Sequence, residues 1–171
     1  MRLIMSLRAQ IESAASRLRE LNEAITRGSI KRDDAWADAC KEFHQSYDAL
    51  AFPGGLDNEI NGLKSGDASS IEMAVTFLEV DAMFFRSGYI KEELLTRLKN
   101  ADLTSSQVQR LSAAILNVVD DRDCREFRRY CQLARRLNSS DLAEKLRARA
   151  DAGDANIARR ARWVLDAIDT K

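Results

Sequence analysis

The spacing of apolar residues near the start of this chain limits the folds that it can adopt. Two runs repeat at alternating intervals of three and four positions, which places them on one face of an α-helix. They comprise Ile4, Leu7, Ile11, Ala14, Leu18, Leu21 and Ile25, then Trp36, Cys40, Phe43, Tyr47 and Leu50. Gly28 and Ser29 lie between the runs and are typical of a helix end. Residues 1–51 are therefore expected to form an antiparallel hairpin of two heptad helices.

A glycine-rich segment interrupts the helical pattern after this hairpin. Residues 52–70 contain the only proline and four of the seven glycines of the chain. This composition predicts a loop with at most one helical turn. Residues 71–171 return to helical spacing in shorter runs, and the first of these, from Ile71 through Phe85, is expected to end at Gly88. The whole chain is expected to fold as one compact domain.

Capping residues divide the second half of the chain into short helices. Thr104 and Gln107 have the spacing of a capping box. Asn138 can end one helix, Ser139 or Ser140 can begin the next, and Asp154 can begin the last. No segment alternates with the period of a β-strand. The sequence therefore predicts an all-α fold of stacked helical hairpins.

The last two of these expected helices resemble a known repeat family. The segment "DANIARRARWVLDAI" resembles the second helix of a HEAT repeat, and "SDLAEKLRARADAGD" resembles the first. Asp154, Ile157, Arg159, Ala161 and Leu165 occupy the motif positions. The resemblance implies a HEAT-like α-solenoid over residues 71–171, built as a right-handed stack of helix pairs. It also implies a role in binding and no catalytic chemistry.

The sequence contains no pattern that indicates export or membrane insertion. The longest apolar runs fall short of the roughly 18 residues that a membrane-spanning helix needs. The first ten residues, "MRLIMSLRAQ", lack the apolar core of a signal peptide. Three cysteines, an odd number, fit a reducing compartment better than a disulfide framework. We therefore expect a cytoplasmic protein.

Catalytic and metal-binding motifs are absent from the sequence. His44 is the only histidine and has no nucleophile motif to accompany it. The three cysteines, Cys40, Cys124 and Cys131, show no metal-binding spacing and are expected to serve as small apolar residues. The glycine-rich segment has Ala68 where a calcium loop would need its twelfth ligand. The expectation is a protein that is not an enzyme and that has no cofactor or metal.

An arginine-rich helix is the strongest candidate for a binding surface. The segment "REFRRYCQLARRL" carries its apolar residues on one face and its arginines on the other. The candidate partner-binding residues are Arg125, Arg128, Arg129, Arg135 and Arg136, joined by Arg159, Arg160 and Trp163 from the last helix. Arginine suits bidentate contact with carboxylate or phosphate. Trp163 either covers a neighbouring helix, the commoner outcome, or lies exposed among arginines as in an interface hot spot.

Charge is distributed unevenly along a chain that is neutral overall. Residues 1–85 contain 9 Lys/Arg and 14 Asp/Glu, whereas residues 86–171 contain 18 and 13. The favoured function is a non-enzymatic protein-binding module with one partner protein. An acidic partner would contact the arginines, or a basic partner would contact the acidic first half. The protein is expected to be a monomer, or a dimer through its first helix.

Two classes of partner remain open at this level. In size and style the chain resembles bacterial immunity or antitoxin proteins, which implies an inhibitor of one partner protein, and an adaptor fits as well. The alternative is a nucleic-acid binder that holds the phosphate backbone through the arginine-rich helices. A neutral chain with an isoelectric point near 6.6 makes the alternative the second choice, because nucleic-acid modules are usually strongly basic.

Overall fold

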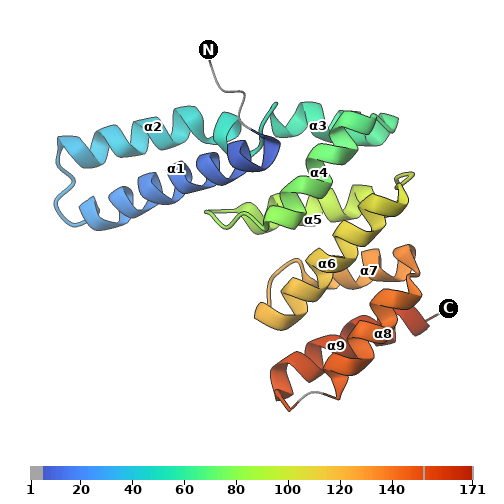
Figure 1. Cartoon of the computed structure of the whole chain (residues 1–171). Coiled ribbons are helices and arrows are strands. Elements are labelled where there is room, and N and C mark those ends of the chain that lie inside the picture. The colour runs from blue at the N-terminus through green and yellow to red at the C-terminus, as the bar shows by residue number, and fades with distance from the viewer. Residues whose placement is uncertain (1–5, 152, 171) are drawn as a thin grey trace.

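The protein is all-helical in the computed structural model, which describes residues 6–151 and 153–170 (Figure 1). The helices are α1 (Leu7–Gly28), α2 (Asp34–Ala51), α3 (Leu56–Ser65), α4 (Ala68–Val80), α5 (Ser87–Leu98), α6 (Ser105–Asp121), α7 (Phe127–Leu137), α8 (Ser140–Ala150) and α9 (Ala155–Asp169). No β-strand occurs in these ranges. The predicted all-α class is confirmed.

Side-chain caps fix where most of these helices begin. A side-chain oxygen of the residue before the helix accepts a backbone N–H of the first turn in six of them. These cap residues are Ser6, Asp33, Asp67, Thr104, Ser139 and Asp154. The predicted capping box is confirmed, because the Gln107 side chain also accepts the backbone N–H of Thr104 at 3.0 Å. Asn138 ends α7 in the left-handed conformation, as its position in the sequence indicates.

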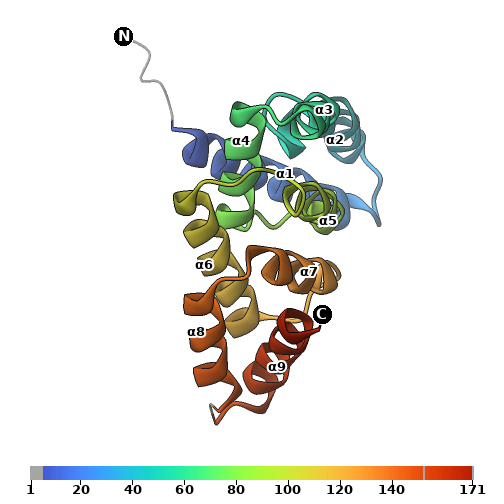
Figure 2. The same cartoon turned by 90° about the vertical axis from the view of Figure 1, so that its right-hand side faces the viewer.

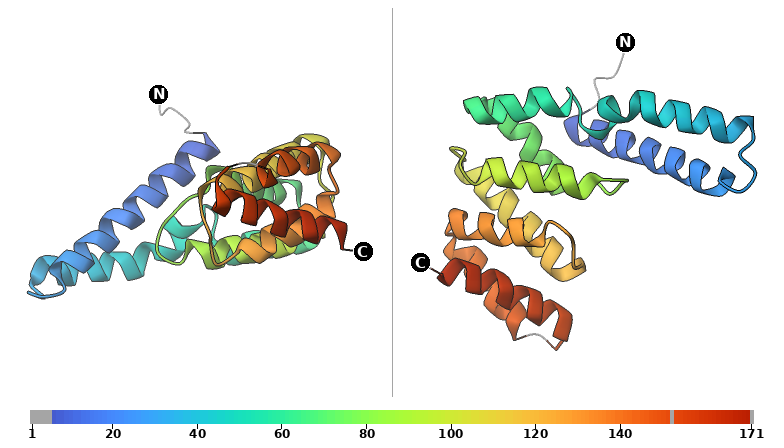
Figure 3. Two further views of the ribbon diagram at one scale, coloured as in Figure 1. Left: turned by 90° about the horizontal axis from the view of Figure 1, so that it is seen from below. Right: turned by 180° about the vertical axis from the view of Figure 1, so that it is seen from behind.

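The predicted N-terminal hairpin is present. Helices α1 and α2 run antiparallel and pack closely together, and the hairpin projects from the rest of the molecule (Figure 3, left). Leu18 and Leu21 of α1 and Phe43 of α2 are buried. Ala15 is buried more deeply than Ala14, the predicted stripe position. Ile4, the first residue of the predicted stripe, lies outside the described residues.

The other helices form two layers. Helices α3, α5, α7 and α9 lie side by side in one layer, and α4, α6 and α8 form the other (Figure 2). The first layer is seen in the right panel of Figure 3, where α5, α7 and α9 begin at the edge from which the hairpin projects. Helix α1 packs on α4, so the hairpin joins the second layer. One continuous apolar core extends from Ile11 to Val164.

The prediction of a loop over residues 52–70 is wrong. Ten of these residues form α3, whose Ile60 and Leu63 are buried. Glycines lie at both ends of this helix because they adopt positive φ there, 86° at Gly55 and 76° at Gly66. Inside the helix, a Cβ at Gly62 would overlap the Ser70 hydroxyl of α4. The glycines therefore delimit α3 and allow it to pack closely against α4.

The prediction that one helix continues from Ile71 to Gly88 is also wrong. Helix α4 ends at Val80, and the segment Asp81–Arg86 is a loop before α5. The loop reverses the chain through positive φ at both of its ends, 53° at Asp81 and 66° at Arg86. Phe85 was expected in the core and is half exposed. Gly88 lies in the first turn of α5, where a Cβ would come within 2.9 Å of the Glu126 carboxylate.

Removing the Thr104 cap should destabilise the fold measurably. In Thr104→Ala the backbone N–H of Gln107 loses its 3.2 Å acceptor, which should lower the free energy of unfolding by about 1 kcal/mol. Urea denaturation monitored by circular dichroism measures this change. Ser105→Ala is the matched control, because Ser105 is exposed at the first position of the same helix. An equal loss in both variants would contradict a capping role.

Candidate functional site

Helix α7 presents its arginines away from the core. Phe127, Tyr130 and Leu133 are buried on its inner face, as the sequence predicts. Arg128, Arg135 and Arg136 are exposed and have no ion-pair partner among the described residues. These three guanidinium groups are the part of the predicted stripe that is both open to solvent and without an ion-pair partner in the described structure.

Arg125 and Arg129 are held by a carboxylate of the neighbouring helix. Their Nε atoms each lie 3.3 Å from a different carboxylate oxygen of Glu92 on α5. Arg129 also donates through Nη1 to the Gln132 side chain at 3.1 Å. Glu92 therefore holds both arginines against α5, one at each of its carboxylate oxygens. Both terminal nitrogens of Arg125 are without a hydrogen-bond partner in the described part of the chain.

Arg160 does not belong to an exposed arginine surface. Its side chain is buried, and it donates through Nε to the Val119 carbonyl at 2.6 Å and through Nη2 to the Asp120 carbonyl at 3.2 Å. These carbonyls lie in the last turn of α6, where no helical N–H is left to bind them. Arg160 therefore closes the end of α6, and its inclusion among the partner-binding residues is corrected.

Trp163 and Arg159 remain at the surface of α9. Trp163 is 47% exposed, so it is not buried under a neighbouring helix as most tryptophans are. One edge of its ring packs against Phe127 of α7 with centroids 5.9 Å apart. The Arg159 guanidinium lies 5.1 Å from the Trp163 ring centroid and binds Asp123 through Nη2 at 2.9 Å. The arrangement is an exposed aromatic ring beside an arginine.

The α4–α5 loop supplies surface residues that the sequence analysis missed. Met83 and Phe85 in the loop and Tyr89 in the first turn of α5 are 49%, 50% and 55% exposed. Arg86 lies 5.4 Å from the Phe85 ring centroid, and Arg125 lies 3.8 Å from that of Tyr89. The available signal was the run "AMFF" directly before a new helix, where apolar residues need not face the core.

These residues form one candidate binding surface, which we call the aromatic–arginine surface. It comprises Met83, Phe85, Arg86, Tyr89, Arg125, Arg159 and Trp163. Arg125 connects its two parts, because it covers Tyr89 and lies two positions before Phe127, which contacts Trp163. Tyr89 lies in the first turn of α5, Arg125 just before α7 and Arg159 in the second turn of α9, and these helices begin at the same edge (Figure 3, right). Trp163 lies further along α9, in its middle.

Contacts from several helices hold the α4–α5 loop in place. Arg19 of α1 donates to the Met83 carbonyl at 2.9 Å, and the Tyr47 hydroxyl of α2 donates to the Phe85 carbonyl at 2.8 Å. Partial burial raises the pKa of Tyr47, so the hydroxyl keeps its donated proton at neutral pH. The projecting hairpin therefore fixes the loop that carries Met83 and Phe85.

A buried ion pair lies beneath the same loop. Lys91 of α5 is fully buried, and its Nζ lies 2.5 Å from Asp81 Oδ1 and 3.3 Å from Met83 Sδ. Arg122 binds both oxygens of Asp81, at 2.6 and 2.8 Å. Burial acts to raise the pKa of Asp81, but the Arg122 hydrogen bonds and the Lys91 charge outweigh it and lower that pKa. Asp81 therefore remains ionised between two cations.

Two of the cysteine thiols are protonated at neutral pH, and the single histidine is exposed. Burial raises the pKa of the Cys124 thiol to about 12 and that of Cys131 to about 11, so neither is a thiolate at neutral pH. His44 is exposed and contacts only the Phe43 ring among the interactions of the described residues. Within those residues no three His, Cys, Asp or Glu side chains are grouped as metal ligands would be.

Comparisons of the chain with protein-family models, with curated proteins and with solved structures give no match. The physical character of the surface is therefore the basis for a functional proposal. Over the described part of the chain, no helix combines the length and the apolar character that crossing a membrane requires.

The buried ion pair should be more sensitive to loss of its anion than to loss of its lysine. Asp81→Ala leaves Lys91 buried and unpaired, which should cost about 3 kcal/mol of unfolding free energy or more. Lys91→Met removes the buried charge and keeps an apolar side chain of similar length, so its cost should be smaller. Urea denaturation of the two variants compares these effects. A larger loss in Lys91→Met would contradict the assigned electrostatics.

The lowered pKa of Asp81 predicts a pH dependence of stability. At pH values above 3.8, the ordinary pKa of an aspartate, the Asp81 carboxylate contributes its full stabilisation. This contribution is lost as the pH falls through the lower pKa that Asp81 has in the folded state. Asp81→Asn should therefore lose less unfolding free energy than the wild type between neutral and acid pH. Denaturation at several pH values measures this. Asp38→Asn, an exposed change on α2, should keep the wild-type dependence.

Proposed function

We propose that this chain is a non-enzymatic protein-binding module whose aromatic–arginine surface docks on an acidic surface of one partner protein. One observation carries the proposal. Among the described residues, five large apolar side chains are exposed, and four of them belong to this surface: Met83, Phe85, Tyr89 and Trp163. Exposed aromatic rings with neighbouring arginines have the composition of protein-interface hot spots.

The arginines of the surface favour a partner that presents carboxylates. Arg86 has no ion-pair partner among the described residues, and Arg125 is bound to Glu92 only through Nε. A guanidinium lying over an aromatic ring keeps its N–H groups in its own plane, where a carboxylate can accept them. An acidic partner would therefore bind the arginines while its apolar atoms contact the exposed rings.

The same geometry makes a protein partner preferable to nucleic acid. Glu92 and Asp123 already neutralise part of the charge of Arg125 and Arg159, so this surface lacks the excess of unpaired cations that a phosphate backbone needs. Arg125 covers one face of Tyr89 at 3.8 Å, so that face is closed to a stacking base. Nucleic-acid binding stays the alternative because Arg128, Arg135 and Arg136 carry exposed charges without carboxylate partners in the described structure.

The architecture supports the finer proposal of a short HEAT-like stack. In such repeats, successive helix pairs place equivalent helices side by side in two layers. The layers α3–α5–α7–α9 and α4–α6–α8 agree with that arrangement (Figure 2). The aromatic–arginine surface would serve an inhibitor of the immunity or antitoxin type, and it would equally serve an adaptor. The buried α1 stripe packs on α2 and α4, which favours a monomer over a dimer through the first helix.

Truncating the aromatic rings should abolish partner binding. The wild-type protein, used as bait in a nuclease-treated lysate, should retain one protein in 1:1 stoichiometry. Tyr89→Ala combined with Trp163→Ala should lose it, because truncating an aromatic hot-spot residue costs about 2 kcal/mol or more of binding free energy. The affinity of the purified pair, measured by titration calorimetry for both baits, gives the size of the loss.

Ile30→Ala provides a matched control for this experiment. Ile30 is 92% exposed at the tip of the α1–α2 hairpin and is the one exposed large apolar residue of the described set outside the surface. The control bait should bind as the wild type does. Loss of the partner in Ile30→Ala and retention in the double variant would contradict the proposed surface. Recovery of nucleic acid alone would favour the alternative.

A further inference from the structure

A second charged region lies at the opposite end of α7 from Arg125. A surface hollow of about 490 Å³ is lined by Lys99, Asn100, Gln132, Arg135 and Arg136. These residues come from the ends of α5 and α7, which are neighbours in one layer. The volume lies in the range of small-molecule sites, roughly 300–1,000 Å³. The hollow is thus large enough for a small ligand.

The lining of this hollow offers hydrogen-bond donors and contains no carboxylate. Lys99, Arg135 and Arg136 supply three cationic groups, and none of them has an ion-pair or side-chain hydrogen-bond partner among the described residues. The Oε1 atom of Gln132 already accepts from Arg129 at 3.1 Å, which leaves the amide nitrogen as its donor. Such a site matches a ligand group that carries several negative charges and only acceptor atoms.

Basic residues near helix C-termini also have a simpler use. Lysine and arginine in a last turn offset the negative end of the helix dipole and can bind the free carbonyls. Lys99, Arg135 and Arg136 make no hydrogen bond to such a carbonyl within the described structure. Arg149, in contrast, donates to the Lys145 carbonyl of its own helix at 3.2 Å. The three cations of the hollow therefore keep their donors free.

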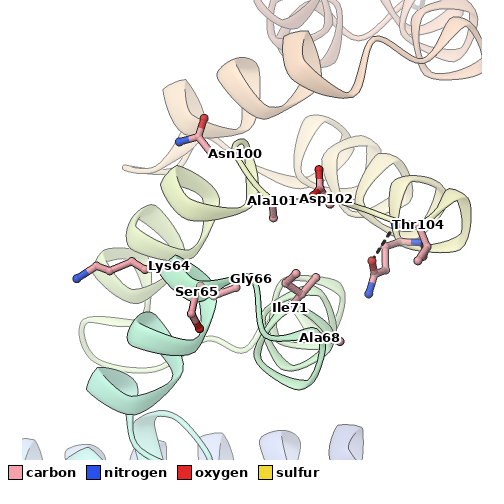
Figure 4. A pocket seen from close by; sticks show the side chains of 11 residues that line it. Lys64, Ser65, Gly66, Ala68, Ile71, Asn100, Ala101, Asp102 and Thr104 are labelled. Carbon is pink, nitrogen blue, oxygen red and sulfur yellow. Dashed lines mark hydrogen bonds between the residues drawn. The ribbon is translucent and has the colours of Figure 1, made fainter.

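Two further hollows continue from this one. Asn100 is shared with a hollow of about 340 Å³ between the α3–α4 and α5–α6 turns, in which Lys64 and Asn100 lie on one side and Thr104 on the other (Figure 4). Arg136 is shared with a smaller hollow lined by Leu103, Val108 and Leu137. Asp102 lines both neighbouring hollows and is absent from the lining of the basic one. An organic group attached to a bound anion would find apolar side chains beside Arg136.

We propose that the hollow between the ends of α5 and α7 binds a small phosphorylated molecule, with Lys99, Arg135 and Arg136 holding its phosphate oxygens. Phosphate oxygens only accept hydrogen bonds, and their negative charge would neutralise these three cations, which have no ion-pair partner among the described residues. Arginine presents two parallel donors to such a group, and Asn100 and Gln132 add neutral donors. Arg125 lies two residues before Phe127, the first residue of α7, and eight residues of helical rise, roughly 12 Å, separate Phe127 from Arg135. This site is therefore distinct from the aromatic–arginine surface.

Calorimetric titration with inorganic pyrophosphate at physiological ionic strength tests the proposal. The wild-type protein should bind the probe saturably with 1:1 stoichiometry. Arg135→Gln combined with Arg136→Gln should weaken binding about tenfold or more, because each removed guanidinium takes charge-assisted hydrogen bonds with it. Both residues are exposed, so the double variant should keep the wild-type circular dichroism spectrum and melting temperature.

Arg128→Gln is the matched control, since Arg128 is an exposed arginine of the same helix outside the hollow. It should bind pyrophosphate as the wild type does. Absence of saturable binding, or equal weakening in the control, would overturn the proposal. Citrate binding as tight as pyrophosphate binding would overturn the assignment of phosphate. Binding of duplex DNA without binding of pyrophosphate would replace it with backbone recognition.

Discussion

The contact between Lys91, Asp81 and Arg122 is the interaction on which the rest of this structure depends. A fully buried lysine is costly unless a carboxylate pairs with it, and Asp81 meets that requirement at 2.5 Å. Arg122 binds the same carboxylate from a segment 41 residues further along the chain. These bonds join the end of α4, the middle of α5 and the turn between α6 and α7. Asp81 adopts a left-handed backbone conformation at this point, and its carboxylate holds the turn in place.

This electrostatic contact determines what the α4–α5 loop displays. Because Asp81 turns the chain away from α4, Met83 and Phe85 leave the core and reach solvent. Arg19 and Tyr47 hold the loop from the side of the hairpin, through hydrogen bonds to two of its carbonyls. The hairpin thus has a structural task beyond its own pairing. A loop held by contacts from several helices loses little further conformational entropy when a partner binds to it.

Local signals in the sequence predicted much of the fold. Heptad spacing can be recognised in α1 and α2 because it relates residues within one or two helical turns. The same holds for the helix caps, which are Thr104, Ser139 and Asp154. The apolar face of α7 follows from its periodicity for the same reason. Helix α3 is not evident from the sequence, because glycine usually disfavours a helix, whereas Gly62 allows close packing against Ser70.

The candidate surface was harder to predict because it depends on contacts distant in sequence. The end of α4 at Val80 is fixed by Lys91 and Arg122, and the apolar run after it continues the helical spacing that begins at Ile71. Arg160 resembled its exposed neighbour Arg159, yet it reaches the carbonyl of Val119, 41 residues earlier. Whether an arginine of an amphipathic helix meets solvent or a neighbouring helix end is decided by packing between helices.

The partner is proposed to bind to the aromatic–arginine surface. Hydrogen exchange tests this most directly, when it is measured for the protein alone and in complex with the protein that it captures. The partner should slow amide exchange in residues 81–89 and in residues 159–163 of α9, and should leave α6 and α8 unchanged. These two helices belong to the opposite layer (Figure 2). Protection confined to α8, or to the tip of the α1–α2 hairpin, would contradict it, because the partner would then bind away from the aromatic–arginine surface.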